Sequence, residues 1–229
     1  NQPTQYQVET ITEVRVWSLE RLRFQELIQQ YPQITQAFSQ QLATQVKELS
    51  EQLLFEQERQ LILRPYLVSR AKRGVIGKSR YATRLRSQIK QAAQTRESVL
   101  IFGEPGLEKD NLATLIHFGS AHRRQPIIKI DCSKLQTSGA ELFGRSGGKP
   151  GLIASLQEGT LILNNVHLLT QELIPAIADL LKTHQYTPIT RPGGEAAEPQ
   201  TSQARIILIS EQAISAIDSV VENLIKVPP

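Results

Sequence analysis

The sequence predicts an α/β fold in which a doubly wound parallel sheet is preceded by a strand and a long helical stalk. Four short, nearly continuous apolar runs begin at Ser98, Pro126, Thr160 and Arg205. Runs of this kind are typical of parallel strands buried on both faces. Helical segments at about 109–121 and 170–184 separate them, which is the alternation of a doubly wound domain. The stalk is predicted from a helical pattern of about thirty residues that follows Pro32.

Composition limits the classes of protein to consider. A chain of 229 residues with 40% hydrophobic content can bury one main core and a smaller annex. Its 26 basic and 22 acidic residues give a net charge of +4, which allows a polyanionic partner without requiring one. The single cysteine, Cys132, excludes an internal disulfide framework and is expected to be a buried apolar residue in a reducing compartment.

No run is long enough for a membrane-spanning helix and no signal segment opens the chain, so we expect a cytoplasmic protein without a membrane partner. The sequence contains no methionine, from which we expect it to be a piece of a longer protein.

The first elements differ in character from the rest of the chain. Residues Glu9–Leu19 partly alternate and are rich in β-branched side chains, which predicts one strand. Leu22, Leu27 and Ile28 then flank Phe24 on one helical face that continues to Pro32.

The long helix after Pro32 carries an apolar stripe. Its steps of 4, 4, 4, 3 and 4 residues drift from a strict heptad, so the stripe predicts a short dimer seam and not a long coiled coil. Packing of the stripe on its own domain is the alternative, and the sequence leaves both open. The stripe consists of Ile34, Phe38, Leu42, Val46, Leu49 and Leu53, with Leu61 further along.

A basic run covers residues 64–96, which contain ten arginines and lysines. Such a run could contact a phosphate backbone. It lacks a repeated pattern of aromatic side chains for base stacking, which favours a solvated helix face leading into the next domain. Nucleic acid is therefore not a required partner.

A phosphate loop needs glycines, a lysine that reaches the β and γ phosphates, and a Ser or Thr hydroxyl on magnesium. Gly103, Gly106 and Lys109 stand in the expected places between a strand and a helix. Glu108 replaces the second motif glycine and Asp110 replaces the hydroxyl residue. The predicted nucleotide-contacting residues are Gly103, Glu104, Pro105, Gly106, Leu107, Glu108, Lys109 and Asp110.

Glu108 decides whether this loop can bind a nucleotide. A carboxylate about 4 Å from a phosphate charge would be repelled by roughly 4 kcal/mol at an effective dielectric of about 20. This corresponds to about a thousandfold in affinity. A side chain turned into solvent would avoid much of that penalty. ATP or ADP stays open as a ligand, and magnesium binding is disfavoured.

The second motif of an ATP-hydrolysing site is an acidic pair at the end of a buried strand. Its aspartate binds magnesium and its glutamate polarises the attacking water. Asn164 and Asn165 occupy these positions after the run Leu161–Leu163. An amide carries no charge and cannot act as a general base at pH 7. Hydrolysis is therefore not expected, and no catalytic residue is assigned.

Residues 75–229 resemble the AAA+ module of bacterial enhancer-binding proteins, the activators that remodel sigma-54 RNA polymerase. The resemblance implies a P-loop AAA+ sheet with degenerate Walker motifs. It rests on blocks in order at 75–79 (Val-Ile-Gly-Lys-Ser), 99–106 (Val-Leu-Ile-Phe-Gly-Glu-Pro-Gly), 130–132 (Ile-Asp-Cys), 141–144 (Glu-Leu-Phe-Gly), 158–163 (Glu-Gly-Thr-Leu-Ile-Leu) and 205–210 (Arg-Ile-Ile-Leu-Ile-Ser).

The departures from that family concern its functional positions. Residues 145–154 replace the family's Gly-Ala-Phe-Thr-Gly-Ala loop, which contacts the sigma factor. Glu211 stands at the position of the sensor asparagine, and Ile217 and Asn223 stand near the positions of the arginine fingers. The family's helical lid would follow Pro229.

The amino-terminal piece is similar to the last strand and following helices of catabolite-activator-type cyclic-nucleotide-binding domains, in which the long helix is the dimer interface. An unrelated helical linker is the rival reading. We expect three parts: the end of a sensor domain at 1–32, a helical linker at 33–73, and the AAA+-like domain without its lid at 74–229.

The predicted function is a catalytically silent AAA+-like regulatory module of a signalling or transcription regulator, which binds ATP or ADP without hydrolysis or binds neither. The alternatives are a divergent, active ATPase that acts as a sigma-54-type activator, and a dimerising scaffold without nucleotide. The expected partner is a second copy, or a higher oligomer, through the long helix. The four histidines show no metal-ligand spacing, His117 and His122 lying five residues apart, so no metal site is predicted.

Overall fold

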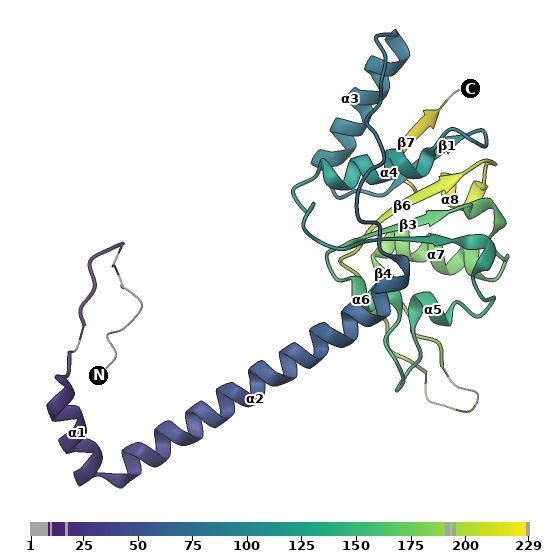
Figure 1. The fold of residues 1–229 in the computed structure, drawn as a ribbon. Helices are drawn as coiled ribbons and strands as arrows, with labels where there is room; N and C mark the ends of the chain where they lie inside the picture. Colours follow the sequence, from purple (N-terminus) through teal and green to yellow (C-terminus); the bar gives the residue numbers. More distant parts are fainter. Residues whose placement is uncertain (1–8, 10, 17, 191–192, 194–195, 228–229) are drawn as a thin grey trace. The chain divides into compact units, whose positions relative to one another are not determined.

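The computed structural model describes residues 9, 11–16, 18–190, 193 and 196–227. The chain forms two units, Asn1–Phe55 and Glu56–Pro229, which are considered separately below (Figure 1). In the part of the chain that is described, no helix combines the length and the hydropathy that are needed to cross a membrane.

The helices of the first unit are α1 (Arg21–Gln30) and the greater part of α2, which begins at Pro32 and continues to Leu63 in the second unit. Proline suits the first turn of a helix because its missing N–H would have no partner there. The rings of Phe24 and Phe38 meet edge to face, with centroids 6.3 Å apart. The prediction of a long helix after Pro32 is confirmed.

The strand predicted at Glu9–Leu19 is not formed by the described residues of that segment; Thr10 and Trp17 lie outside them. A single extended segment has no neighbour to pair its backbone groups, so alternation and β-branching alone do not produce a strand.

The second unit is built on a five-stranded parallel sheet with the order β2-β3-β6-β1-β7. The four predicted apolar runs form its four neighbouring strands, which confirms the predicted α/β class. The fifth strand lies at the edge beside β1. The strands are β1 (Val99–Gly103), β2 (Ile127–Asp131), β3 (Thr160–Asn164), β6 (Arg205–Ser210) and β7 (Asn223–Val227).

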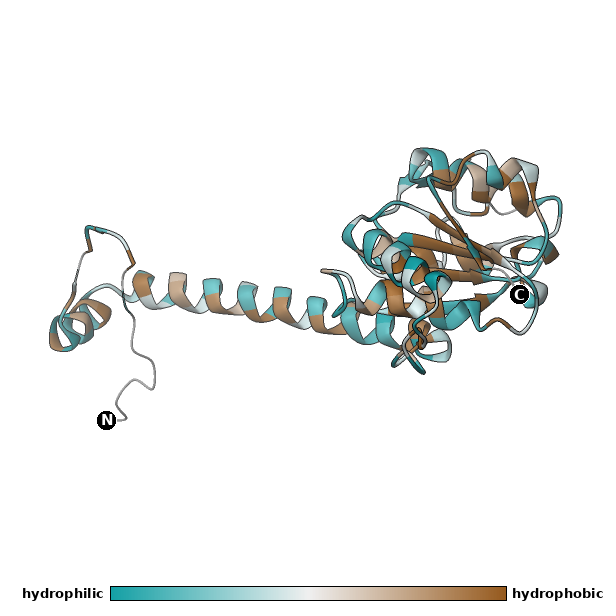
Figure 2. Ribbon diagram, turned by 90° about the horizontal axis from the view of Figure 1, so that it is seen from above, coloured by the Kyte–Doolittle hydropathy of each residue, from teal (hydrophilic) through white to brown (hydrophobic). Residues whose placement is uncertain are grey.

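Helices cover both faces of the sheet because alternate strand residues are apolar on both sides. Ile101, Ile162 and Ile207 pack with α3 and α4 on one face. Leu161 and Leu208 pack on the other with α5–α8, and Figure 2 shows the strands as a hydrophobic layer. The helices are α3 (Arg80–Gln94), α4 (Lys109–Phe118), α5 (Ala140–Phe143), α6 (Leu152–Leu156), α7 (Leu173–Thr183) and α8 (Ser215–Asp218), with short 3-10 turns at Arg64–Tyr66, Cys132–Lys134 and Val166–Leu168.

Two smaller features complete this unit. After α7 the chain forms a hairpin, in which β4 (Gln185–Tyr186) pairs antiparallel with β5 (Gln200–Thr201). The end of α2 docks on the unit, since Leu63 is buried in the core and Arg59 donates a hydrogen bond to the Ser155 carbonyl oxygen at 2.6 Å. Cys132 is buried as predicted, and burial raises the pKa of its thiol to about 12.

Candidate functional site

The candidate site lies at the carboxyl edge of the sheet, where β1 is flanked by β6 and β7 while the next strand in the chain, β2, lies beyond β6 and β3. Open parallel sheets place ligands at such a switch point. The loop 104–108 leads from the end of β1 into α4. Asp131, Asn164 and Ser210 end the neighbouring strands β2, β3 and β6.

Backbone geometry explains which glycines of the loop were kept. A Cβ on Gly103 would lie 2.5 Å from the Val227 carbonyl oxygen of the adjacent strand, so only glycine fits there. Gly106 has a φ of +83°. Glu108 also adopts the left-handed conformation, with φ +47° and ψ +40°, which costs a side-chain-bearing residue roughly 1–2 kcal/mol. A backbone conformation that favours glycine is therefore adopted at Glu108 by a residue that carries a carboxylate.

Lys109 is held inside the protein by two oxygens. Its side chain is 5% exposed, and its Nζ donates to the Glu104 carbonyl oxygen at 2.5 Å. The same nitrogen forms an ion pair with Glu211 Oε1 at 3.2 Å. Glu211 directly follows β6. The residue at the predicted sensor position thus neutralises the lysine of the phosphate loop.

The two other acidic replacements are also paired with bases. Glu108 accepts from Arg73 at 3.1 Å. Asp110 contacts Lys129 of β2 at 3.1 Å and Lys72 at 3.8 Å. Burial acts to raise the pKa of Asp110, but the hydrogen bond and the charge of Lys129, helped by Lys72, outweigh it and hold that pKa below its usual value. Asp110 is therefore ionised at neutral pH.

Lys72 and Arg73, called here the basic strap, are fixed by one buried side chain. Asn111 Oδ1 accepts from the Lys72 N–H at 2.8 Å and the Arg73 N–H at 3.4 Å. Its Nδ2 donates to the Arg73 carbonyl oxygen at 2.6 Å. Asn111 is 5% exposed, so its amide anchors the strap over the first turn of α4.

The strand ends beside the loop carry amides and one carboxylate. Asn165 adopts the left-handed conformation and donates from Nδ2 to Asp131 Oδ1 at 3.1 Å. Burial acts to raise the pKa of Asp131, but the hydrogen bonds from Asn165 and Ser133 lower it overall. His167 Nδ1 accepts from the Glu211 N–H at 3.3 Å, which connects this group to the partner of Lys109.

A cavity of about 680 Å³ opens beside the start of the loop. Gly103, Glu104 and Glu211 line one part of it, and Tyr81 and Arg84 of α3 line another. The volume falls in the range of small-molecule sites. The wall nearest Lys109 is formed by the two acidic residues Glu104 and Glu211.

Residues 75–223 match the family model described as the sigma-54 interaction domain. This chain belongs to the sigma-54 interaction domain family. The transcriptional regulator VasH of Vibrio cholerae is 29% identical over 164 residues, which cover 67% of this chain and 30% of that protein. The anaerobic nitric oxide reductase transcription regulator NorR of Aeromonas hydrophila is 33% identical over 131 residues, covering 53% of this chain and 25% of the relative. The chain therefore spans a third or less of these two relatives.

Solved structures support the fold of this sigma-54 interaction domain. NtrX from Brucella abortus, crystallised in complex with ADP, is similar with a TM-score of 0.57 at 23% identity, over 67% of this chain and 36% of that one. A further NtrX structure covers 84% of this chain and 43% of its own, with a TM-score of 0.56 and 20% identity.

The structure brings most of the sequence-predicted residues of the domain to one edge. The loop 103–110, Asn164, Asn165 and Glu211 all lie at the carboxyl ends of neighbouring strands. Of the two positions near the family's arginine fingers, Ile217 is buried and Asn223 donates from Nδ2 to Glu97 at 2.7 Å. Sequence reasoning missed the basic strap and Lys129. The basic run at 64–96, which includes Lys72 and Arg73, was the available signal for the strap.

A magnesium nucleoside triphosphate does not fit these residues as they are paired. The lysine that would contact the phosphates is bound to Glu211, and the residue in place of the magnesium-binding hydroxyl is bound to Lys129 and Lys72. The charged side chains at this loop are thus paired with one another.

Proposed function

We propose that this sigma-54 interaction domain is a catalytically silent regulatory module, which transmits a signal within a transcription regulator without hydrolysing nucleotide. Transcription regulation is supported by the relatives NorR and VasH, which are named as transcription regulators. Nucleotide as a ligand is supported by NtrX, which was crystallised with ADP and with ATP.

One observation carries the proposal. At the carboxyl end of β3, where ATP hydrolysis would need a magnesium ligand and a group that polarises water, the structure has the amides of Asn164 and of Asn165 directly after it. The Asn165 amide is turned to Asp131, to which it donates. An amide nitrogen that donates to a carboxylate has no proton-accepting function.

The test is ATP turnover by the purified protein, with Lys109→Ala as the matched loss-of-site variant. We expect phosphate release at the level of the buffer blank, unchanged by Lys109→Ala. Turnover that is clearly above the blank and is abolished by Lys109→Ala would disprove catalytic silence.

The second candidate is a divergent, active ATPase, and Asp131 is the observation that favours it. Its carboxylate lies one strand away from the amide pair and has a lowered pKa, so it is an ionised group at this edge. If Asp131 supplies the missing charge, Asp131→Asn should abolish turnover while Asn164→Asp with Asn165→Glu changes it little. If the module is catalytically silent, both the wild type and Asp131→Asn release phosphate only at the rate of the buffer blank.

Contact with the sigma factor is proposed to differ from that of the family. The segment after α5 makes a tight turn in which Gly144 and Pro150 form a bridge. Arg145 and Ser146 pair with Ile189 of the hairpin, the Ser146 N–H donating to the Ile189 carbonyl oxygen at 3.0 Å. This segment replaces the family's sigma-contacting loop and is bound to its own hairpin, which supports a target other than the sigma factor.

We also propose that the apolar stripe on α2 pairs with a second copy of this chain. Phe38, Leu42, Val46, Leu49 and Leu53 are all more than half exposed. The positions 42, 46, 49 and 53 follow steps of 4, 3 and 4, which is the spacing of a coiled-coil seam.

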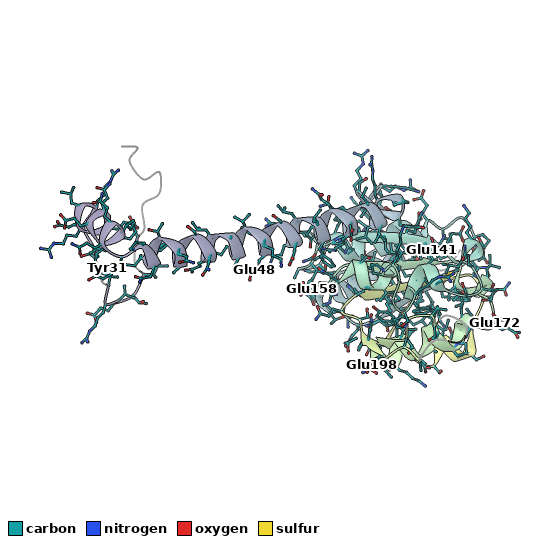
Figure 3. All side chains as sticks on the ribbon, turned by 90° about the horizontal axis from the view of Figure 1, so that it is seen from below. Tyr31, Glu48, Glu141, Glu158, Glu172 and Glu198 are labelled. Carbon is teal, nitrogen blue, oxygen red and sulfur yellow. The ribbon has the colours of Figure 1, made fainter. Side chains whose placement is uncertain are left out.

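The charges of α2 support this pairing. The charged residues of these turns, Lys47, Glu48 and Glu51, point away from the stripe by helical periodicity, and Glu48 is labelled in Figure 3. Lys47 and Glu51 form an ion pair at 3.9 Å on that opposite face. A second copy can therefore dock without burying a charge. The seam covers about two heptads, so we expect a weak dimer.

A further inference from the structure

We propose that Glu211 acts as an internal anion that occupies the phosphate-binding position of Lys109, and that it sets the affinity of this loop for nucleotides. This inference rests on the proposed function, because it explains how a retained phosphate loop operates as a regulated binding site and not as an ATPase site. Glu211 is then a specificity-determining residue that selects against nucleoside di- and triphosphates.

The hydrogen-bonding capacity of Lys109 is the first argument. An ammonium group has three N–H donors. One is used by the Glu104 carbonyl oxygen and one by Glu211 Oε1, so a single donor remains. Contact with oxygens of both the β and γ phosphates requires two. A triphosphate therefore has to displace one of these two acceptors, and Glu211 is the one that carries a charge and competes with phosphate as an anion.

Charge balance is the second argument. The four cations Lys72, Arg73, Lys109 and Lys129 are paired with the three carboxylates Glu108, Asp110 and Glu211, which leaves a net charge of 4 − 3 = +1. An incoming polyphosphate would meet three carboxylates that are already bound to the cations it needs. The loop offers it little net electrostatic attraction.

Burial of the paired cation distinguishes Glu211 from the other two carboxylates: the Asp110 side chain is 23% exposed, but its partners Lys129 and Lys72 are 40% and 68% exposed. The Arg73 and Glu108 side chains are 64% and 41% exposed, and exposed pairs of this kind are screened and contribute little. Lys109 is 5% exposed and Glu211 28%. An ion pair with one buried partner is screened less, and its buried cation needs a counter-charge. Of the three carboxylates, Glu211 is accordingly the main determinant of the loop's affinity for nucleotides.

The position of Glu211 allows it to be moved by a signal. It follows β6, and its N–H is bound to His167 Nδ1 in the 3-10 turn after Asn165. A shift of either segment would withdraw the carboxylate from Lys109 and expose a cation for phosphate. A partner that displaces this segment would therefore switch nucleotide affinity.

The experiment is a titration of the full chain with a fluorescent ATP analogue, in the presence and absence of magnesium, for wild type and Glu211→Gln. The glutamine keeps an oxygen acceptor for Lys109 but removes the charge. We expect Glu211→Gln to lower Kd by about 10- to 100-fold, the range that corresponds to one charge-assisted hydrogen bond. Glu172→Gln removes an exposed carboxylate, labelled in Figure 3, that lines a different cavity beside Ser138 and Tyr186, and it is expected to leave Kd unchanged.

Two further variants attribute the gain to the Lys109 pair. Glu211→Gln combined with Lys109→Ala should lose the gain, and Glu211→Asp, which shortens the side chain but keeps the charge, should lie between wild type and Glu211→Gln. Thermal melts establish whether each variant is folded. If Glu211→Gln does not fold, Glu211→Asp is used in its place to test the inference.

Equal or weaker binding by a folded Glu211→Gln or Glu211→Asp, or a gain that persists without Lys109, overturns the inference. Turnover by the wild type would instead contradict catalytic silence and leave the affinity comparison intact, so the two failures are distinguishable.

Discussion

Asn111→Ala should release the basic strap and destabilise the sigma-54 interaction domain. The substitution removes the Oδ1 acceptor of the Lys72 and Arg73 N–H groups and the Nδ2 donor to the Arg73 carbonyl oxygen. Two of the three hydrogen bonds are short, at 2.8 and 2.6 Å, and the third is long at 3.4 Å.

The expected loss follows from these contacts. At about 1 kcal/mol for each good hydrogen bond, the free energy of unfolding falls by about 2 kcal/mol. The ion pairs of Lys72 and Arg73 add little because both side chains are about two-thirds exposed. For a unit of this size the melting temperature should fall by about 4–8 °C.

The assay is urea unfolding followed by circular dichroism, with limited trypsin digestion as a second measurement. Trypsin cleaves after Lys72 and Arg73, so release of the strap should speed cleavage there under native conditions. Gln91→Ala, an exposed amide on α3, is the matched control and should change stability by less than about 0.5 kcal/mol. An Asn111→Ala protein with the wild-type urea midpoint and cleavage rate would refute the strap's anchoring.

Three other outcomes are expected. Burial lowers the pKa of His117 from its usual 6.5 to about 4; the charge of Arg205 adds to this effect, and a hydrogen bond involving the Gln125 backbone opposes it only in part. As the pH falls, the unfolded state therefore takes up this proton before the folded state does. The contribution of His117 to the free energy of unfolding is complete above pH 6.5 and falls by up to roughly 3 kcal/mol as the pH drops to 4. His117→Gln should flatten that part of a pH series of urea midpoints, and an unchanged slope would contradict it. Leu49→Asp should make the chain monomeric in sedimentation velocity at concentrations where wild type and Glu48→Gln associate, and equal association would remove α2 as the seam. Glu108→Gly should leave stability within about 1 kcal/mol, because relief of the left-handed conformation offsets an exposed ion pair; a loss above about 2 kcal/mol in urea unfolding would show that the Arg73 pair matters more than its exposure suggests.

The sheet was predictable where burial is complete on both faces. The runs that became β1, β2, β3 and β6 are apolar throughout because helices cover both sides. The edge strand β7 was missed, since its residues Asn223–Val227 alternate between exposed and buried and include Lys226. It pairs with β1, and the paired residues Val99 and Asn223 lie 124 residues apart in the chain. A local sequence pattern does not reveal a pairing between segments this far apart.

The position of the site in the fold was predictable from the sequence, whereas the ion pairs of its charged side chains were not. The order strand, glycine loop, helix identified residues 103–110 from local sequence, and the structure places Asn164, Asn165 and Glu211 at the same edge. The consequence expected from Glu108, repulsion of a phosphate, ignored its partner Arg73, which approaches from a segment 35 residues earlier. The partner of Lys109 lies 102 residues later. Such pairs are decided by tertiary structure, which a motif cannot encode.

These long-range pairs imply that substitutions of the three carboxylates have coupled effects on nucleotide affinity. Glu108, Asp110 and Glu211 each neutralise a specific cation, so restoring one family residue alone leaves that cation without its partner. Substitutions at groups in contact are not additive. Glu108→Gly, Asp110→Ser and Glu211→Asn should therefore raise nucleotide affinity more in combination than the sum of their single effects on binding free energy, because only the combination frees all four cations for phosphate. Turnover should stay absent even then, since no carboxylate would have been restored at Asn164 and Asn165.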